Sequence, residues 1–333
     1  MENFIKNVNI QNFKSIADLK LEDCRRINLF IGYPNVGKSN VLEALSLFSV
    51  PFLKEGESLN KLVRFVNKNE LFHNASLMHS IIKTNKGNNV LENEKQLTMI
   101  MDNTSNSFSG YSFSADLKVH CYDDTEKFPD KRRKDIKRYS FQTNNKWESN
   151  GDIQLLPPFG ENIIDTLSYS DSVSEVKAWM KREFKKFGLE YVLDKSTNSL
   201  KVQKRLGNDD VFILPYSSIA DTLQRIIFYK TAIASNKNSV LLFEEPEAHA
   251  FPPYIDTIMY DIIKAKTNQF FIVTHSPLVV NAFLEYKESR EETSIYMFDY
   301  KNDQTTVKRL SDEEIELVYE YGDSLFFNLE NLL

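Results

Sequence analysis

The stretch at residues 27–48, INLFIGYPNVGKSNVLEALSLF, constrains the fold of this 333-residue chain more than any other. Its short apolar run at 27–31 is typical of a strand buried on both faces of a parallel sheet. The eight residues at 32–39 fit the phosphate-loop (P-loop) pattern GxxxxGK[ST] at every fixed position. Apolar residues then recur at helical spacing and stop before Pro51. Strand, loop and helix in this order predict an α/β P-loop NTPase.

The loop explains how a nucleotide could bind. Its backbone N–H groups would point at a β-phosphate, and the positive end of the following helix would add to the attraction. Lys38 would reach the β- and γ-phosphates and stabilise their charge, and the Ser39 hydroxyl would ligate Mg²⁺. The loop residues that we expect to contact the nucleotide are Gly32, Asn35, Val36, Gly37, Lys38, Ser39 and Asn40.

A GTPase is the closest alternative, because the phosphate loop of translation-factor-like GTPases is similar. Such an enzyme also needs a DxxG switch and an NKxD guanine reader. No glycine in the chain has Asp three positions before it. The nearest base-reader fragments, at 67–70 and 145–148, lack the Asp that pairs with guanine. These absences argue against a GTPase.

Two later apolar runs lead into residues that suit phosphate chemistry. The run at 240–243 is followed by Glu244 and Glu245, and the run at 270–273 is shortly followed by His275. Sheets of the α/β type place ligands at the carboxyl ends of their strands. Glu244 would therefore hold Mg²⁺, and Glu245 would orient and deprotonate the attacking water. His275 would sense the γ-phosphate.

The remaining pattern predicts a mixture of short elements. A hairpin or short edge strands are expected at 4–21, and partly helical structure at 52–75. Helices are expected at 161–188, and two strands around a polar turn at 189–214. Pro277 is expected to begin a helix, with Ser276 as its cap.

These motifs, in this order, resemble a known family. The P-loop, LLFEEPEAH at 241–249 and IVTHSP at 272–277 look like the ABC-type ATPases of the RecF/SMC and OLD (overcoming-lysogenisation-defect) kind. The opening IQNFKSI at 10–16 is similar to that group's first strand. The resemblance touches residues 8–48 and 216–284.

The resemblance implies an ABC-type ATPase head that is interrupted by an inserted arm domain. The first part of the head would be residues 1–75 and the second part residues 211–333. The arm would occupy residues 76–210, β-rich first and helical afterwards. The resemblance also adds Asn12 and Lys14 to the expected nucleotide contacts and identifies ATP as the nucleotide.

Membership of this group further implies a signature loop that reaches across a dimer to the partner's γ-phosphate. Residues 219–227, IADTLQRII, align without gaps on the group's LSDGTLRLL. Asp221 and Arg225 match, whereas Ala220 stands where a serine is expected. Two serines, Ser218 among them, lie one turn earlier and could substitute.

A glutamine normally couples the metal to the inserted arm in this group. Gln96, Gln142 and Gln154 are all candidates, and the sequence does not choose between them. Glu244 also replaces the usual Asp, so the metal-binding side chain is one methylene longer.

Composition limits the partners. Two cysteines give no disulfide framework, and no apolar run of about 18 residues could span a bilayer, so we expect a cytoplasmic protein without a membrane partner. The net charge of -6 argues against a nucleic-acid coat protein. The basic run at 127–138, KFPDKRRKDIKR, is either a solvated loop or a contact to nucleic-acid phosphates.

Together, the residues and the resemblance predict an ATPase that forms ADP and phosphate. It would act as a nucleotide-driven switch, a homodimer or higher oligomer with ATP between the heads. Only 58 residues follow His275, too few for the Toprim nuclease domain that often follows in OLD-type proteins. Stand-alone heads of this kind often serve prokaryotic anti-phage systems with a separately encoded effector, so a sensor or regulator role is the first hypothesis. The alternatives are a RecF-like DNA-repair ATPase whose arm binds DNA and a nucleotide-gated scaffold with little turnover.

Overall fold

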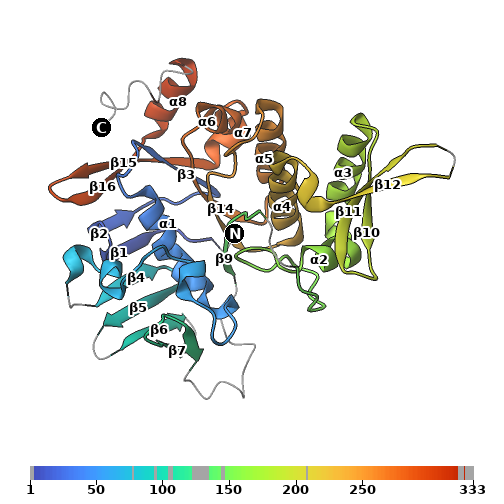
Figure 1. The fold of residues 1–333 in the computed structure, drawn as a ribbon. Coiled ribbons are helices and arrows are strands. Elements are labelled where there is room, and N and C mark those ends of the chain that lie inside the picture. The colour runs from blue at the N-terminus through green and yellow to red at the C-terminus, as the bar shows by residue number, and fades with distance from the viewer. Residues whose placement is uncertain are drawn as a thin grey trace. The chain divides into compact units, whose positions relative to one another are not determined.

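The computed structural model describes most of the chain and divides it into two compact units. The described residues are 4–76, 79–93, 96–103, 108–121, 135–143, 147–207, 209–321 and 326. Unit 1 contains Met1–Arg138, Asn238–Glu245 and Thr267–Leu333, and unit 2 contains Tyr139–Lys237 and Pro246–Lys266. Figure 1 shows their helices and strands.

The first sheet of unit 1 is built from buried apolar strands. Its order is β16-β15-β3-β14-β13-β9. The bounds are β3 Ile27–Gly32, β9 Ile136–Tyr139, β13 Val240–Glu244, β14 Gln269–Val273, β15 Thr293–Lys301 and β16 Gln304–Arg309. Strands β15, β3, β14 and β13 run parallel to one another, and β16 is antiparallel to β15. Every residue of β3 and β14 is buried, which confirms the buried strands predicted from their apolar runs.

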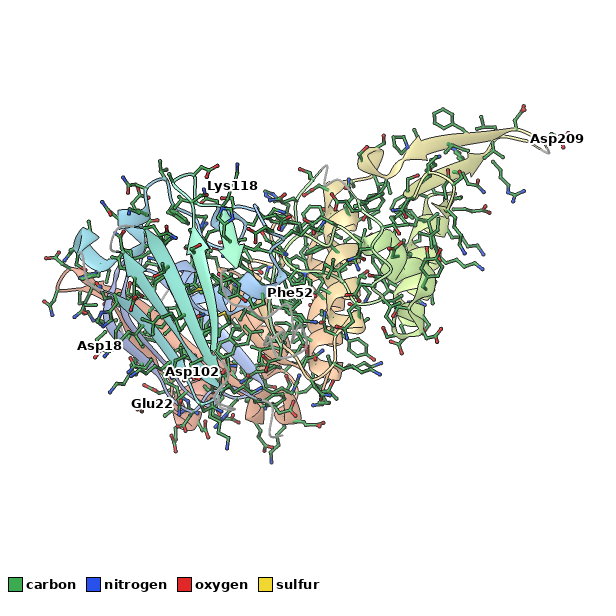
Figure 2. All side chains as sticks on the ribbon, turned by 90° about the horizontal axis from the view of Figure 1, so that it is seen from below. Asp18, Glu22, Phe52, Asp102, Lys118 and Asp209 are labelled. Atoms are coloured by element: carbon green, nitrogen blue, oxygen red, sulfur yellow. The ribbon has the colours of Figure 1, made fainter. Side chains whose placement is uncertain are left out.

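The second sheet of unit 1 is antiparallel and has the order β2-β1-β4-β5-β6-β7-β8. The bounds are β1 Val8–Phe13, β2 Ile16–Leu21, β4 Ser80–Thr84, β5 Gly87–Asn93, β6 Leu97–Asn103, β7 Phe108–Phe113 and β8 Val119–Cys121. The pairing of β1 with β2 confirms the predicted hairpin. Figure 2 shows this sheet, with Asp18 of β2 and Asp102 of β6 labelled. Because β4 pairs with β1, the strands after residue 79 continue the sheet that the N-terminal hairpin begins.

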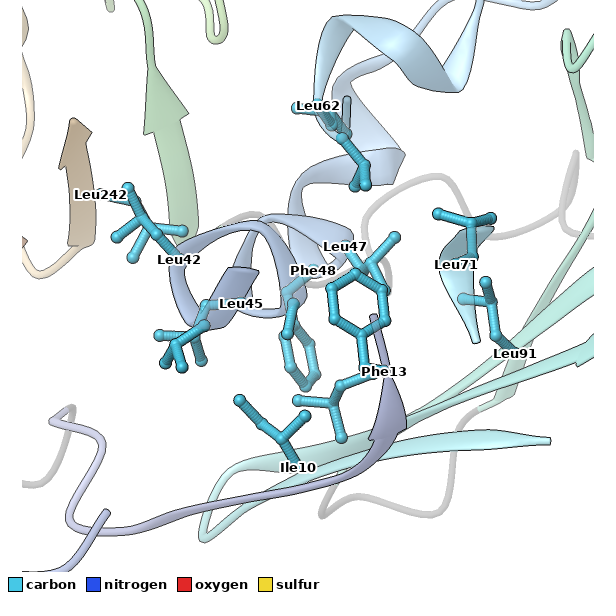
Figure 3. Close-up of a cluster of buried hydrophobic side chains, with 14 of the residues drawn as sticks. Ile10, Phe13, Leu42, Leu45, Leu47, Phe48, Leu62, Leu71, Leu91 and Leu242 are labelled. Carbon is cyan, nitrogen blue, oxygen red and sulfur yellow. The ribbon is translucent and has the colours of Figure 1, made fainter. Parts of the chain in front are cut away.

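Helix α1, Lys38–Ser46, fills the space between the two sheets of unit 1. It contacts β1 of one sheet and β3, β13 and β14 of the other. Figure 3 shows Leu42 and Leu45 of this helix in one buried cluster with Ile10 and Phe13 of β1. The P-loop that precedes α1 is therefore held at both ends, by the buried strand β3 and by the packed helix.

The segment after α1 forms short 3-10 turns. Their bounds are η1 Leu47–Phe52, η2 Leu59–Lys61, η3 Lys68–Leu71 and η4 His73–Ala75. The prediction of helix at 52–75 is therefore met only by single turns. The Ser58 and Asn67 side chains accept hydrogen bonds from the backbone N–H groups of Asn60 and Asn69, which fixes tight turns in place of a continuous helix.

Three helices complete unit 1: α6 Pro277–Leu284, α7 Lys287–Glu291 and α8 Asp312–Tyr321. Pro277 begins α6 as predicted. Ser276 occupies the cap position, but its hydroxyl makes no capping hydrogen bond, so that part of the prediction was wrong. No helix in the described part of the chain is long and apolar enough to cross a membrane.

Unit 2 combines helices with a small antiparallel sheet. Its elements are α2 Ile163–Tyr169, η7 Asp171–Val173, α3 Ser174–Lys186, β10 Glu190–Asp194, β11 Ser199–Arg205, β12 Val211–Pro215, η8 Tyr216–Ser218, α4 Asp221–Ser235 and α5 Pro252–Lys264. The prediction of two strands at 189–214 was wrong, because the sheet has three. Asp194 accepts hydrogen bonds from Ser196 and Thr197, and this turn separates β10 from β11. Figure 2 labels Asp209 at the tip of the β11–β12 hairpin.

Candidate functional site

The parallel register brings three strand ends to one edge of the first sheet. Strand β14 lies between β3 and β13, with Val273 opposite both Phe30 and Glu244. The backbone N–H of Glu245 donates to the carbonyl oxygen of Val273 at 2.9 Å, and that of Thr274 donates to Phe30 at 3.2 Å. The P-loop, the two acids and His275 therefore leave neighbouring strands of unit 1 at the same edge.

The backbone conformation of the P-loop requires glycine at position 37. Gly37 has φ 97°, in the left-handed region. A Cβ atom at Gly37 would lie 2.0 Å from Thr305 Oγ1 and 2.7 Å from Ser15 Oγ, so no side chain fits there. The Asn40 amide donates to the same Ser15 hydroxyl at 2.7 Å. The expected nucleotide contact Asn40 thus ties the start of α1 to the β1–β2 turn.

The N-terminus of α1 suits an anion. Gly37 supplies no capping side chain, and the first turn of α1 holds no acidic residue. Lys38 is buried, and its Nζ donates to the carbonyl oxygens of Gly32 at 2.9 Å and Tyr33 at 2.6 Å. Burial lowers the pKa of the Lys38 ammonium to about 8. The negative charge of Glu245 opposes this shift but is the smaller effect. This cation and the open helix end fit the phosphates of a nucleotide.

Glu244 and Ser39 meet at this edge. The Ser39 hydroxyl lies close enough to the Glu244 carboxylate to help lower the pKa of that carboxyl. A hydroxyl and a single carboxylate are the oxygen ligands that Mg²⁺ commonly takes beside a nucleotide phosphate. The donor set therefore fits the predicted metal, which when bound would neutralise phosphate charge.

Two arginines that the sequence analysis did not single out hold the Glu244 carboxylate. Arg138 Nη2 lies 2.7 Å from Glu244 Oε2, and Arg64 Nη2 lies 2.9 Å from Oε1. Burial raises the pKa of Glu244, but Arg138, Ser39 and Arg64 together outweigh burial and hold it below its usual value. For Arg64, one feature of the sequence could have indicated this role: the arginine stands alone between the apolar residues Val63 and Phe65.

Glu245 and His275 face each other. Glu245 Oε1 and His275 Nε2 are 3.7 Å apart, and both side chains are partly exposed. Glu245 has φ 44°, a strained left-handed conformation for a residue with a side chain, at the end of β13. Burial and the Lys38 charge lower the pKa of His275, against the opposite effect of Glu245. Lys38, Glu245 and His275 thus lie within electrostatic reach of one another.

Asn12 and Lys14 make contacts that hold the β1–β2 turn. The Asn12 side chain accepts a hydrogen bond from the His73 backbone N–H at 3.1 Å. The Lys14 ammonium forms an ion pair with Glu43 and donates to the carbonyl oxygen of Arg64 at 2.6 Å. A direct contact of either residue with a nucleotide stays a prediction.

The residues of the expected signature loop lie in unit 2. Ser218 ends η8, and Ala220 precedes α4 without a side chain that could cap it. Asp221 Oδ1 and Arg225 Nε are buried and have no hydrogen-bond partner in the part of the chain that the structure describes. The Arg225 guanidinium lies over the Phe141 ring, 4.9 Å from its centroid. The two residues that match the family motif are thus the two with unpaired polar atoms here.

The other expected positions are less informative. Gln142 lines a cavity of about 340 Å³ inside unit 2, and Gln96 and Gln154 are exposed. None of these observations selects the coupling glutamine. Most of the basic run, residues 127–134, lies outside the described residues.

Comparison with known proteins agrees with this geometry. Residues 4–74 match the family model described as "AAA ATPase domain", and residues 129–281 match "AAA domain, putative AbiEii toxin, Type IV TA system". Over 77 residues the chain is 35% identical to the DNA replication and repair protein RecF of Caldanaerobacter subterraneus subsp. tengcongensis. That match spans 23% of this chain and only 21% of the RecF protein, about a fifth of its length.

Two solved structures share the fold. The SmcHead bound to the C-winged helix domain of ScpA has a TM-score of 0.53 at 12% identity, over 92% of this chain and 98% of that one. The Smc head domain with an extended coiled coil, bound to the C-terminal domain of ScpA derived from Pyrococcus furiosus, has a TM-score of 0.52 at 13% identity, over 96% and 99%. Together, these matches support an ABC-type, RecF/SMC-like ATPase. The OLD-like subgroup stays a prediction.

The electrostatics of the head predict how His275 titrates. Its pKa should lie below the usual value of about 6.5. Lys38→Met removes a neighbouring positive charge and should raise this pKa, whereas Glu245→Gln removes a negative charge and should lower it further. NMR titration of the His275 ring, assigned with His275→Gln, measures the shifts. Lys287→Met, at a side chain that is 83% exposed, is the control, and equal pKa values in all variants would contradict the geometry.

Proposed function

We propose that this chain binds ATP with Mg²⁺ on its P-loop and hydrolyses it to ADP and phosphate. The observation that supports the proposal most is the convergence of three strand ends in unit 1. It places the loop cation Lys38, the Ser39–Glu244 pair and the Glu245–His275 pair at one edge of the sheet. Phosphoryl transfer needs mostly positioning and charge stabilisation, which these residues can supply.

Each residue has a distinct role in this proposal. Lys38 and the open N-terminus of α1 hold the phosphates, and Ser39 with Glu244 supplies oxygen ligands for the metal. Glu245 orients the attacking water and accepts its proton. The lowered pKa of His275 favours its neutral ring, which can donate or accept a hydrogen bond beside Glu245 and so report whether a γ-phosphate is present.

The proposal includes pairing of two heads around ATP. The matched residues Asp221 and Arg225 carry buried polar atoms without partners in the described part of the chain. Buried polar atoms are normally paired, so a second copy or its nucleotide would satisfy them. Binding and hydrolysis would then open and close a dimer, and the chain would act as a switch.

We propose that this switch serves a prokaryotic anti-phage system with a separately encoded effector. One observation supports this role: the family model that matches residues 129–281 is described as "AAA domain, putative AbiEii toxin, Type IV TA system". Purification of the tagged chain from its native host, followed by mass spectrometry, should identify one stoichiometric effector.

A RecF-like role in DNA repair is the second candidate, and the similarity to RecF favours it. DNA binding would then depend on phosphate contacts and would weaken steeply with salt. Neutralising Arg132 and Arg133 should reduce both the affinity and the salt slope, as measured by fluorescence anisotropy of labelled duplex at several salt concentrations. No binding at low salt would remove this candidate. A scaffold with little turnover is a third possibility, and the hydrolysis test below addresses it.

Glu245→Gln is the sharpest test of hydrolysis. The amide cannot accept the proton of the attacking water, so phosphate release should fall by about 10²–10⁴-fold. ATP binding and ATP-dependent pairing, measured by calorimetry and light scattering, should persist. The control Glu291→Gln, at an exposed side chain, should hydrolyse ATP like the wild type. Wild-type binding without turnover would show the scaffold instead, and full activity of Glu245→Gln would remove Glu245 from the mechanism.

A further inference from the structure

The Glu244 carboxylate already has a cation at each oxygen. Arg138 reaches Oε2 from strand β9, and Arg64 reaches Oε1 from the turn after η2. The Ser39 hydroxyl also favours the charged form of this carboxylate. A metal ion that binds Glu244 must therefore compete with two guanidinium groups.

Arg138 is the stronger of these two competitors. Its side chain is only 6% exposed, so its charge is poorly solvated and depends on the Glu244 counter-ion. One guanidinium nitrogen donates to the Leu62 carbonyl, and the Arg138 backbone N–H donates to Ser49 Oγ at 3.1 Å. Its Nε has no acceptor among the described residues. The Arg138 guanidinium is thus fixed in place, and one of its N–H groups is still able to donate a hydrogen bond.

Arg64 holds Glu244 more weakly. Its side chain is 64% exposed, and water screens an ion pair of this kind. Its Nε also lies 2.7 Å from Oε1 of the buried Glu43, which pairs with Lys14 as well. Arg64 is therefore anchored by Glu43 and shared between two carboxylates.

We propose that Arg138, assisted by Arg64, is a positioning residue that keeps Glu244 neutralised until metal and nucleotide arrive together. The proposal rests on the proposed metal-binding role of Glu244. Transferring Glu244 to a metal alone would leave the buried Arg138 charge without its counter-ion, which is unfavourable. A metal that arrives with ATP brings phosphate anions that offset the loss. The arginines thus weaken metal binding in the absence of nucleotide.

The test measures binding of Mn²⁺ alone, in place of Mg²⁺, to the nucleotide-free chain. The electron paramagnetic resonance signal of free Mn²⁺ falls as the ion binds. Arg138→Met should bind Mn²⁺ about tenfold or more tightly than the wild type, because hydrogen bonds to charged groups are each worth enough for such a factor. Arg64→Gln should give a smaller gain of about two- to fivefold. Arg205→Met, at a side chain 67% exposed in unit 2, is the matched control and should leave the affinity unchanged.

Two further variants complete the test. Adding Glu244→Gln to Arg138→Met should abolish the gain, which assigns the bound ion to Glu244. Arg138→Lys keeps a positive charge and should bind Mn²⁺ about as weakly as the wild type. Circular dichroism establishes which variants are folded, and Arg64→Gln at its exposed site serves if Arg138→Met does not fold.

Unchanged Mn²⁺ affinity in folded Arg138→Met and Arg64→Gln would overturn the proposal. If Arg138→Met does not fold, unchanged Mn²⁺ affinity in Arg64→Gln alone would overturn the proposal. In either case, intact ATP binding that depends on Lys38 would leave the proposed function standing. Loss of that dependence on Lys38 would instead remove the proposed function, whatever the arginine variants do.

Discussion

The parallel pairing of β3, β14 and β13 is the constraint on which the rest of the candidate site depends. Because these strands are neighbours with one direction, whatever follows them must emerge at the same edge. Helix α1 holds the arrangement by packing between the two sheets of unit 1. The fixed backbone then leaves Lys38 and the strained Glu245 beside the same edge.

Local pattern was sufficient to predict the strands and the helix that surround the candidate site. The apolar runs before Gly32, Glu244 and Thr274 are buried strands, and the helix after the loop is buried on more than one face because it packs between two sheets. Continuous apolar runs of this length are typical of strands that are buried on both faces of a parallel sheet. The α/β fold and the P-loop position followed from these features.

Long-range pairing was not accessible from local pattern. The partner of β1 across the sheet is β4, some 70 residues later, and an alternating strand does not specify which distant strand it joins. The same holds for the ion pairs of Glu244, whose partners Arg64 and Arg138 are 180 and 106 residues away. Arg138 stood in a basic run that suggested solvent, whereas the fold buries it.

The most direct test of the central claim is calorimetric titration of the chain with ATP in the presence of Mg²⁺. The account predicts one ATP per chain, with affinity reduced about ten- to hundredfold in Lys38→Ala, because the charged hydrogen bonds of that ammonium to phosphate are lost. Lys287→Ala, at an exposed side chain of the same unit, should bind like the wild type. ATP binding by Lys38→Ala with unchanged affinity would contradict the account.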